Sequence, residues 1–188
     1  MRRVFFYFAL VSLLMACTKD RIYVIKPPDP SNPPTDTSGG GTPVIKLYIN
    51  EFMASNNTAV MDPAGEYDDW LEIYNAGTTI VDLGGYSISD DLSNPTKYVI
   101  PTAQDETKIQ PGGFLIIWCD SQTAQGPLHA GFNLSGGGES IALYRNDQSV
   151  VDSLTYTAQQ SDLSFGRVPD GSPNWQTLTS PSPGASNQ

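Results

Sequence analysis

The chain has 188 residues, and 20 Asp and Glu against 10 Lys and Arg give it a formal net charge of -10. This length fits one domain with a leader better than two domains. A surface this acidic repels phosphate backbones, so we do not expect direct binding to nucleic acid.

The first residues have the pattern of a secretory leader. Two arginines follow Met1, and an apolar run over 4–15 is too short to span a bilayer. The run continues into LLMAC, where Leu14 and Ala16 precede Cys17. This spacing resembles the lipobox of bacterial lipoproteins; the alternative is an ordinary secretory signal with an incidental cysteine. The resemblance implies a signal peptide over 1–16, lipid on Cys17 and attachment to the membrane through that lipid.

Two features that follow Cys17 indicate the location of the protein and the start of its folded domain. Thr18, in place of Asp, favours the outer membrane or cell surface of a diderm bacterium, by resemblance to the sorting rule of lipoproteins. The segment KPPDPSNPPTDTSGGGTP is rich in proline and glycine and cannot form a core. We therefore interpret 17–43 as a lipidated cysteine followed by a stalk, and 44–188 as the folded domain.

From Val44 onward the chain consists of short segments rich in β-branched and aromatic residues, separated by Gly, Pro, Asn or Asp. Apolar residues do not recur with helical spacing in this part of the chain, so the domain is predicted to be all-β. The segments predicted as strands are VIKLYINEF, DWLEIY, GYSIS, KYVIP, GGFLIIWC, HAGFNL, ESIALYR, SVVDSLTY and SFGR. Their spacing predicts an antiparallel sandwich or barrel. The segment around Trp175 is interpreted as irregular.

The run FLIIWC is apolar at every position, which predicts a central strand covered on both faces, with Ile116 in the core. Cys119 ends this run and is interpreted as a packed hydrophobic residue. If Cys17 carries lipid, Cys119 has no partner for an intramolecular disulfide.

An ordered series of motifs resembles the bacterial lamin tail domain family. The series begins with INEFMAS, DDWLEIYN and VDLGGYSISDD, continues through IQPGGFLIIW and GESIALY, and ends with SFGRVPDG and SPGASN. The resemblance runs from Ile45 to the end of the chain. It implies an immunoglobulin-like antiparallel β-sandwich, in agreement with the strand pattern.

The sequence offers little for catalysis. The sequence contains no Gly-x-Ser-x-Gly motif whose serine the single histidine, His129, could activate. His129 is therefore interpreted as a residue near a sheet edge. One histidine and one cysteine without lipid are too few for a zinc site built from those residue types. The glycines of GGGES are interpreted as a hairpin turn, because the Lys-Ser/Thr of a phosphate loop does not follow them.

The acidic stretch EYDDWLEIYNAG raises the question of a metal site. Strand alternation places Trp70, Glu72 and Tyr74 on one half-buried face and the residues between them in the core. If the strand beginning at Asp69 and the strand ending before Asp90 are antiparallel neighbours, their acidic ends meet. A weak Ca²⁺ site could then take oxygen ligands from Glu66, Asp68, Asp69, Asp90 and Asp91; the alternative is a solvated acidic rim that holds no cation.

Arg167, in SFGR, is one of few basic residues in the domain. It is predicted to clamp the last strand by pairing with a carboxylate, with Glu72 and Asp152 as candidates.

The sequence as a whole favours a non-catalytic, surface-tethered domain that binds a protein or an envelope polymer. The alternative is an extracellular hydrolase of polymers that uses the acidic loops, with Ca²⁺ as its cation. The sequence supplies no convincing set of nucleophile, base and oxyanion donors for that alternative.

Overall fold

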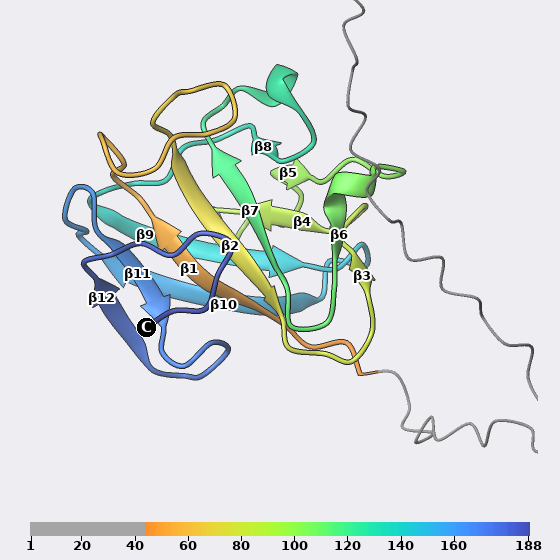
Figure 1. Cartoon of the computed structure of the whole chain (residues 1–188). Coiled ribbons are helices and arrows are strands. Elements are labelled where there is room, and N and C mark those ends of the chain that lie inside the picture. Colours follow the sequence, from red (N-terminus) through yellow and green to blue (C-terminus); the bar gives the residue numbers. More distant parts are fainter. Residues whose placement is uncertain (1–43) are drawn as a thin grey trace, which may run out of the picture. The chain divides into compact units, whose positions relative to one another are not determined.

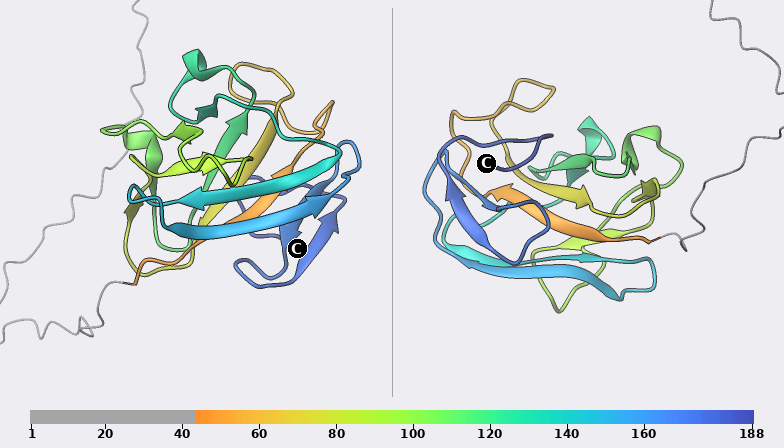
Figure 2. Two further views of the ribbon diagram at one scale, coloured as in Figure 1. Left: turned by 180° about the vertical axis from the view of Figure 1, so that it is seen from behind. Right: turned by 60° about the horizontal axis from the view of Figure 1, so that its bottom comes forward.

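The computed structural model describes residues 44–188; the predicted signal peptide, Cys17 and the stalk lie outside the described residues. In residues 44–188 the strands form two main sheets that face each other (Figures 1 and 2). The larger sheet has the order β12-β11-β1-β2-β7-β8, the second has β10-β9-β4-β5, and β3 pairs with β6. No α-helix occurs in the described part of the chain, so the all-β prediction is confirmed.

The strands of the larger sheet are β1 (Leu47–Met53), β2 (Asp69–Asn75), β7 (Phe114–Cys119), β8 (His129–Ala130), β11 (Ser164–Arg167) and β12 (Trp175–Leu178). Those of the second sheet are β4 (Ser87–Ser89), β5 (Tyr98–Val99), β9 (Gly138–Tyr144) and β10 (Val150–Thr157). The remaining elements are β3 (Val81–Asp82), β6 (Lys108–Ile109) and the 3-10 turns η1 (Asp105–Thr107) and η2 (Thr123–Gln125). Between residues 44 and 188 no helix is long and apolar enough to cross a membrane.

The main core lies between the two sheets and is built from the alternate residues of their strands. Leu71 and Ile73 of β2 point into it, as alternation predicts, and meet Ile141 and Leu143 of β9 in the same buried cluster. On β7 the fully buried aliphatic residue is Ile117. Ile116 is half-buried and packs against the cluster on the opposite face, so the full burial expected for it is not found.

The outer face of the larger sheet is also covered, as the apolar run of β7 predicts for that strand. Trp70 and Glu72 are completely buried there, whereas alternation had placed them on a half-buried face. Trp70 packs with Met53 and Trp118 in a second, smaller apolar cluster. The residues after β12 cross this face in front of β1 and cover the carboxylate of Glu72 (Figure 1).

Three predictions about connections are corrected. The segment around Trp175 is a strand, because β12 pairs with β11 along its length, with Arg167 opposite Trp175. The GGGES turn leads from β8 in one sheet to β9 in the other and is therefore not a hairpin turn. β2 and β4 are not neighbours, because β2 pairs with β1 and β7 whereas β4 pairs with β5 and β9.

Candidate functional site

The five carboxylates predicted to share one Ca²⁺ do not form one group. In the described residues, the acidic groups whose possible ligand atoms lie within 4.8 Å of one another include Glu66 and Asp68 but not the other three. Asp90 forms an ion pair with Lys97, and its Oδ2 accepts a hydrogen bond from Lys97 Nζ at 2.8 Å. The exposed Asp91 accepts hydrogen bonds from the backbone and hydroxyl of Ser93 within its own loop. The prediction is wrong because it assumed that β2 and β4 are neighbours, whereas they belong to different sheets.

Asp69 has a separate structural environment. Its Oδ1 accepts the backbone N–H of Asn56 at 3.2 Å, which ties the β1–β2 loop to the start of β2. Burial raises the pKa of the Asp69 carboxyl to about 6, although hydrogen bonds from the backbone of Asn56 and Leu134 favour the charged form. Asp69 therefore acts as an anchor for the loop.

Glu66 and Asp68 lie beside a residue that the sequence did not single out, Asp62. The loop closes on itself at Asp62, whose N–H donates to the carbonyl oxygen of Glu66 at 2.8 Å and whose Oδ1 accepts the N–H of Glu66 at 2.7 Å. Glu66 is exposed, and its carboxylate accepts hydrogen bonds from the side-chain amides of Gln122 and Gln125, each at 2.9 Å. The β1–β2 loop and the β7–β8 connection are thus joined by polar contacts.

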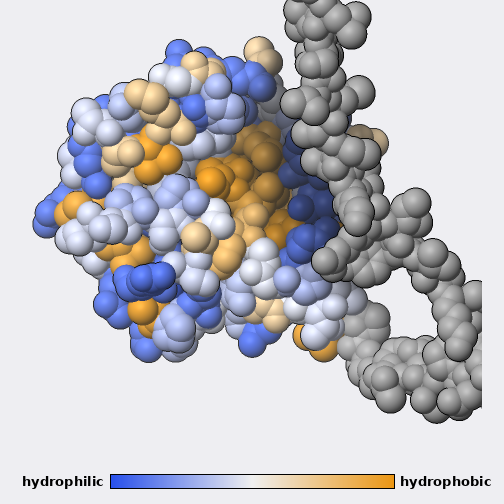
Figure 3. Space-filling view, in the orientation of Figure 1, coloured by the Kyte–Doolittle hydropathy of each residue, from blue (hydrophilic) through white to orange (hydrophobic). Residues whose placement is uncertain are grey.

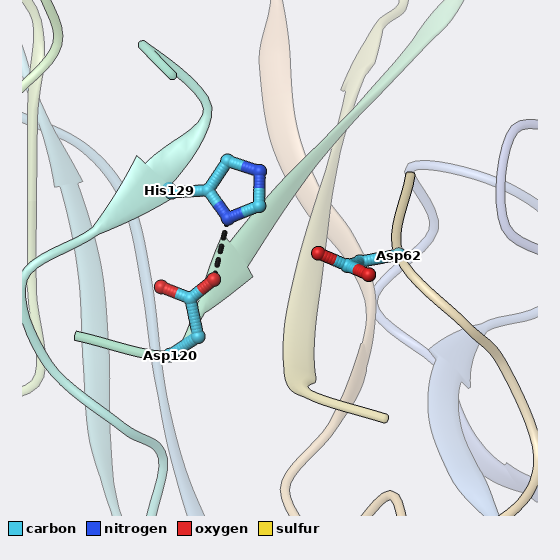
Figure 4. Close-up of side chains that lie close together, drawn as sticks. All are labelled: Asp62, Asp120 and His129. Atoms are coloured by element: carbon cyan, nitrogen blue, oxygen red, sulfur yellow. Dashed lines mark hydrogen bonds and ion pairs between the residues drawn. The ribbon is translucent and has the colours of Figure 1, made fainter. Parts of the chain in front are cut away.

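Asp62 also faces Asp120 and His129 across this end of the sandwich (Figure 4). Asp120 follows β7 directly, and His129 begins β8, which pairs in parallel with β7 so that His129 lies opposite Trp118. His129 Nδ1 and Asp120 Oδ2 are 2.5 Å apart, and Asp120 Oδ1 accepts the N–H of Gln122 at 2.7 Å. Asp62, Asp120 and His129 are each 6% exposed. We refer to Asp62, Glu66, Asp68, Asp120 and His129 as the acidic-histidine cluster.

The charges of the cluster act on the Asp68 carboxyl. The pKa of Asp68 is raised, first by burial and then by the negative charges of Asp120, Asp62 and Glu66. His129 is the group that acts in the opposite direction and lowers the pKa of Asp68. The Asp68 carboxyl therefore responds to charges that come from separate segments of the chain.

A second group of acids lies under the C-terminal segment, on the outer face of the larger sheet. Glu51 accepts hydrogen bonds from the hydroxyls of Ser164 and Ser182, and Glu72 accepts the N–H of Gly184 at 2.6 Å. Both glutamates are 0% exposed. Burial raises the pKa of Glu72 to about 8, against the effect of its hydrogen bonds with Gly184 and Asn50. This group fastens the end of the chain to the sheet.

Arg167 joins the two sheets. Its guanidinium lies 2.9 Å from Asp152 Oδ2, so the paired carboxylate is that of Asp152 on β10 and not that of Glu72. Arg167 Nε donates to the carbonyl oxygen of Ile49, and Nη1 donates to that of Ser172. The guanidinium also lies over the ring of Trp175, 4.6 Å from its centroid.

The described cysteine has no features of a nucleophile. Cys119 is completely buried, and burial raises the pKa of its thiol well above the ordinary value. His129 contacts Asp120, and no hydroxyl or thiol among residues 44–188 is hydrogen-bonded to its ring. The geometry therefore resembles a binding or structural cluster more than the triad of an acyl transferase.

The family model described as Lamin Tail Domain matches residues 42–158. The chain belongs to the lamin tail domain family. Lamin tail domains have an immunoglobulin-like fold and are non-catalytic binding or scaffold modules, so the predicted fold and family are confirmed. No curated protein and no solved structure matches the chain.

The matched part of the lamin tail domain ends just after β10. It contains the acidic-histidine cluster, whereas β11, β12 and the C-terminal segment follow it. The motif resemblance runs to the end of the chain, but the family match ends at residue 158. The structure assigns the later residues to the same domain, because β11 and β12 belong to the larger sheet. Asp62 and Asp120 were missed because they are far apart in the sequence and no local pattern links them; the parallel pairing of β8 with β7 brings His129 to Asp120.

Proposed function

We propose that this protein is a non-catalytic lipoprotein whose lamin tail domain binds a protein or an envelope polymer at the cell surface. The observation that carries the proposal is the combination of a lipobox-like cysteine and a lamin tail domain in one chain. In this proposal Cys17 carries the lipid, the Pro- and Gly-rich stalk separates the domain from the membrane, and the domain provides the binding surface. The outer membrane of a diderm bacterium is the proposed location.

The outer face of β7 is the surface that best supports binding. Figure 3 shows an apolar patch over this part of the sheet, beside the C-terminal segment. Phe114 and Ile116 are half-buried on that face, and the Phe114 ring stacks on Tyr74 at 4.9 Å between centroids. Apolar and aromatic side chains grouped on a surface are typical of interfaces.

Site-specific photocrosslinking in intact cells tests this proposal. A benzophenone amino acid replaces Phe114 in the full-length chain, and a matched variant carries it at Thr155, an exposed residue of β10 on the second sheet. We expect a discrete adduct from position 114 and none from position 155. Mass spectrometry of the adduct distinguishes a protein partner from an envelope polymer.

Two results would contradict the proposed binding surface. The first is the absence of any adduct at position 114 in cells where the protein is correctly located. The second is the same set of adducts from both positions, because that result indicates contact by proximity alone. Membrane attachment itself is tested separately at Cys17.

A further inference from the structure

The acidic-histidine cluster lies at one end of the sandwich, where segments distant in the sequence meet. Asp62, Glu66 and Asp68 come from the β1–β2 loop, Asp120 from the end of β7 and His129 from the start of β8. The carboxylates of Asp62 and Asp120 lie beside the imidazole, those of Glu66 and Asp68 form a second group with Asp62, and three of the five residues are buried. A concentration of negative charge in a buried place is costly unless a cation or hydrogen bonds compensate it.

Hydrogen bonds within the protein compensate only part of this charge. Asp62 is 6% exposed, and its Oδ1 accepts the N–H of Glu66, but its Oδ2 is buried and has no hydrogen-bond partner. Asp68 Oδ2 is buried without a partner as well. Buried polar atoms are paired in the great majority of cases, so two such oxygens in one cluster require an explanation.

The Asp62 carboxylate, which carries one of these unpartnered oxygens, is directed into the cluster. Figure 4 shows the Asp62 carboxylate facing the imidazole of His129 and the carboxylate of Asp120. One possible ligand atom from each of these residues lies within 4.8 Å of the others, and the same holds for Asp62, Glu66 and Asp68. Asp62 belongs to both groups, so its carboxylate links the acidic residues of the β1–β2 loop to Asp120 and His129.

We propose that the cluster is a binding site for a divalent first-row transition metal, Mn²⁺ or Zn²⁺, with Asp62, Asp120 and His129 as ligands. Asp68 and Glu66 supply further oxygen atoms on the side of the loop. The metal satisfies the unpartnered oxygen of Asp62 and joins the β1–β2 loop to the ends of β7 and β8. This inference does not depend on the proposed role of the protein at the cell surface.

The ligand types select the class of cation. Ca²⁺ takes oxygen ligands, whereas imidazole suits zinc and related transition metals and carboxylates suit manganese. A count of histidine and cysteine alone disfavours zinc, but aspartate oxygen is also a common zinc ligand, at about 2.0–2.2 Å. A site with two aspartates and one histidine therefore fits Mn²⁺ or Zn²⁺ better than Ca²⁺.

Binding requires a small local movement. Two adjacent ligand atoms on one metal are about 3.0–3.4 Å apart, from octahedral to tetrahedral geometry, when each metal–ligand distance is about 2.1 Å. His129 Nδ1 and Asp120 Oδ2 lie 2.5 Å apart, so they separate by roughly 0.5–0.9 Å if both bind the same ion. Nδ1 binds the ion without a proton, and the neutral imidazole then carries its ring proton on Nε2, because a ligating nitrogen must carry a free electron pair.

Calorimetric titration of the full-length chain in detergent tests the site after metal is removed by chelation. We expect one-to-one binding of Mn²⁺ or Zn²⁺, tighter than that of Ca²⁺, and a rise in melting temperature with the bound metal. Asp62→Asn keeps the oxygen that accepts the N–H of Glu66 but removes the charge, and we expect it to weaken binding by at least about tenfold. His129→Gln is expected to have an effect of similar size.

The matched control is the Asp90→Asn/Asp91→Asn double variant, because these carboxylates belong to other contacts. It should bind the metal as the wild type does. Melting temperatures measured in chelator show whether each variant is folded, and Asp68→Asn provides a second test if Asp62→Asn is not. Failure of Mn²⁺ and Zn²⁺ to bind at millimolar concentration, tighter binding of Ca²⁺, or wild-type affinity in both the Asp62 and His129 variants would overturn the proposal.

Discussion

Strand alternation predicts which face of a sheet a side chain lies on, but it does not predict how deeply that side chain is buried. Alternation correctly placed Leu71 and Ile73 in the core, and it placed Glu72 on the other face. It could not predict that Glu72 is completely buried, because the covering Gly184 is 112 positions away in the sequence. Arg167 was recognisable as a clamp because basic residues are scarce, but only the fold selects Asp152 over Glu72 as its partner.

Glu72 makes the stability of the domain dependent on pH. Its pKa is about 8 in the folded protein, against an ordinary value of 4.5, so between these pH values the folded state holds a proton that the unfolded chain has lost. The free energy of unfolding therefore falls as pH rises through this window, by an amount on the order of a few kcal/mol. Glu72→Gln mimics the protonated form, and we expect it to flatten this dependence and to be the more stable variant above pH 8.

Urea denaturation of the full-length chain in detergent between pH 5 and pH 9 measures this effect. Glu106→Gln, at an exposed position in η1, is the matched control and should follow the wild type. A wild-type stability that does not fall between pH 6 and pH 9, or falls equally in Glu72→Gln, would show that another group is responsible.

Arg167→Ala is expected to destabilise the domain. The substitution removes a charged hydrogen bond to Asp152, and such bonds contribute about 1.5–3 kcal/mol. It also leaves the carbonyl oxygen of Ile49 without its donor from Arg167. The free energy of unfolding, measured by urea denaturation, should fall by at least that amount, whereas Arg145→Ala should have little effect because Arg145 has no side-chain hydrogen bond within residues 44–188. Equal midpoints for the two variants would show that Arg167 is not a clamp.

The sequence predicts most of the strands, but it does not predict which strands pair with one another. Short alternating or apolar segments are local signals, which explains why most strands of both sheets were recognised. Pairing is determined by the whole chain, so the assignment of β2 and β4 to different sheets had no local signal. The predicted Ca²⁺ site depended on that pairing and failed with it, and the acidic-histidine cluster was missed for the same reason.

The two faces of β7 provide a test of the sandwich. Ile117 is 0% exposed in the main core, whereas the adjacent Ile116 is half-buried on the outer face. We expect Ile117→Ala to lower the free energy of unfolding by about 2–5 kcal/mol, because it leaves a cavity between the sheets. Ile116→Ala is the matched control and should cost less. A larger loss for Ile116→Ala in urea denaturation would mean that the faces of this strand are assigned the wrong way round.

The whole molecule combines a domain that the structure describes with an N-terminal part known only from its sequence. The family match and the two-sheet architecture agree on the domain, since both indicate an immunoglobulin-like fold. Membrane attachment depends on different evidence, the residues around Cys17. The two parts can therefore be tested independently.

Cys17→Ser is expected to abolish lipid modification and release the protein from the membrane without changing its fold. The physical reason is that two acyl chains on the sulfur, with an N-acyl group, anchor a protein stably, whereas the apolar run over 4–15 is too short to span a bilayer. The measurement is phase partition in a cloud-point detergent after metabolic labelling with palmitate. Wild-type protein should carry label and enter the detergent phase, and Cys17→Ser should do neither. Cys119→Ser is the matched control, because Cys119 is buried within the domain and should not affect labelling. Retention of Cys17→Ser in the detergent phase with wild-type labelling would reject the lipid anchor and leave the identification of the lamin tail domain unchanged.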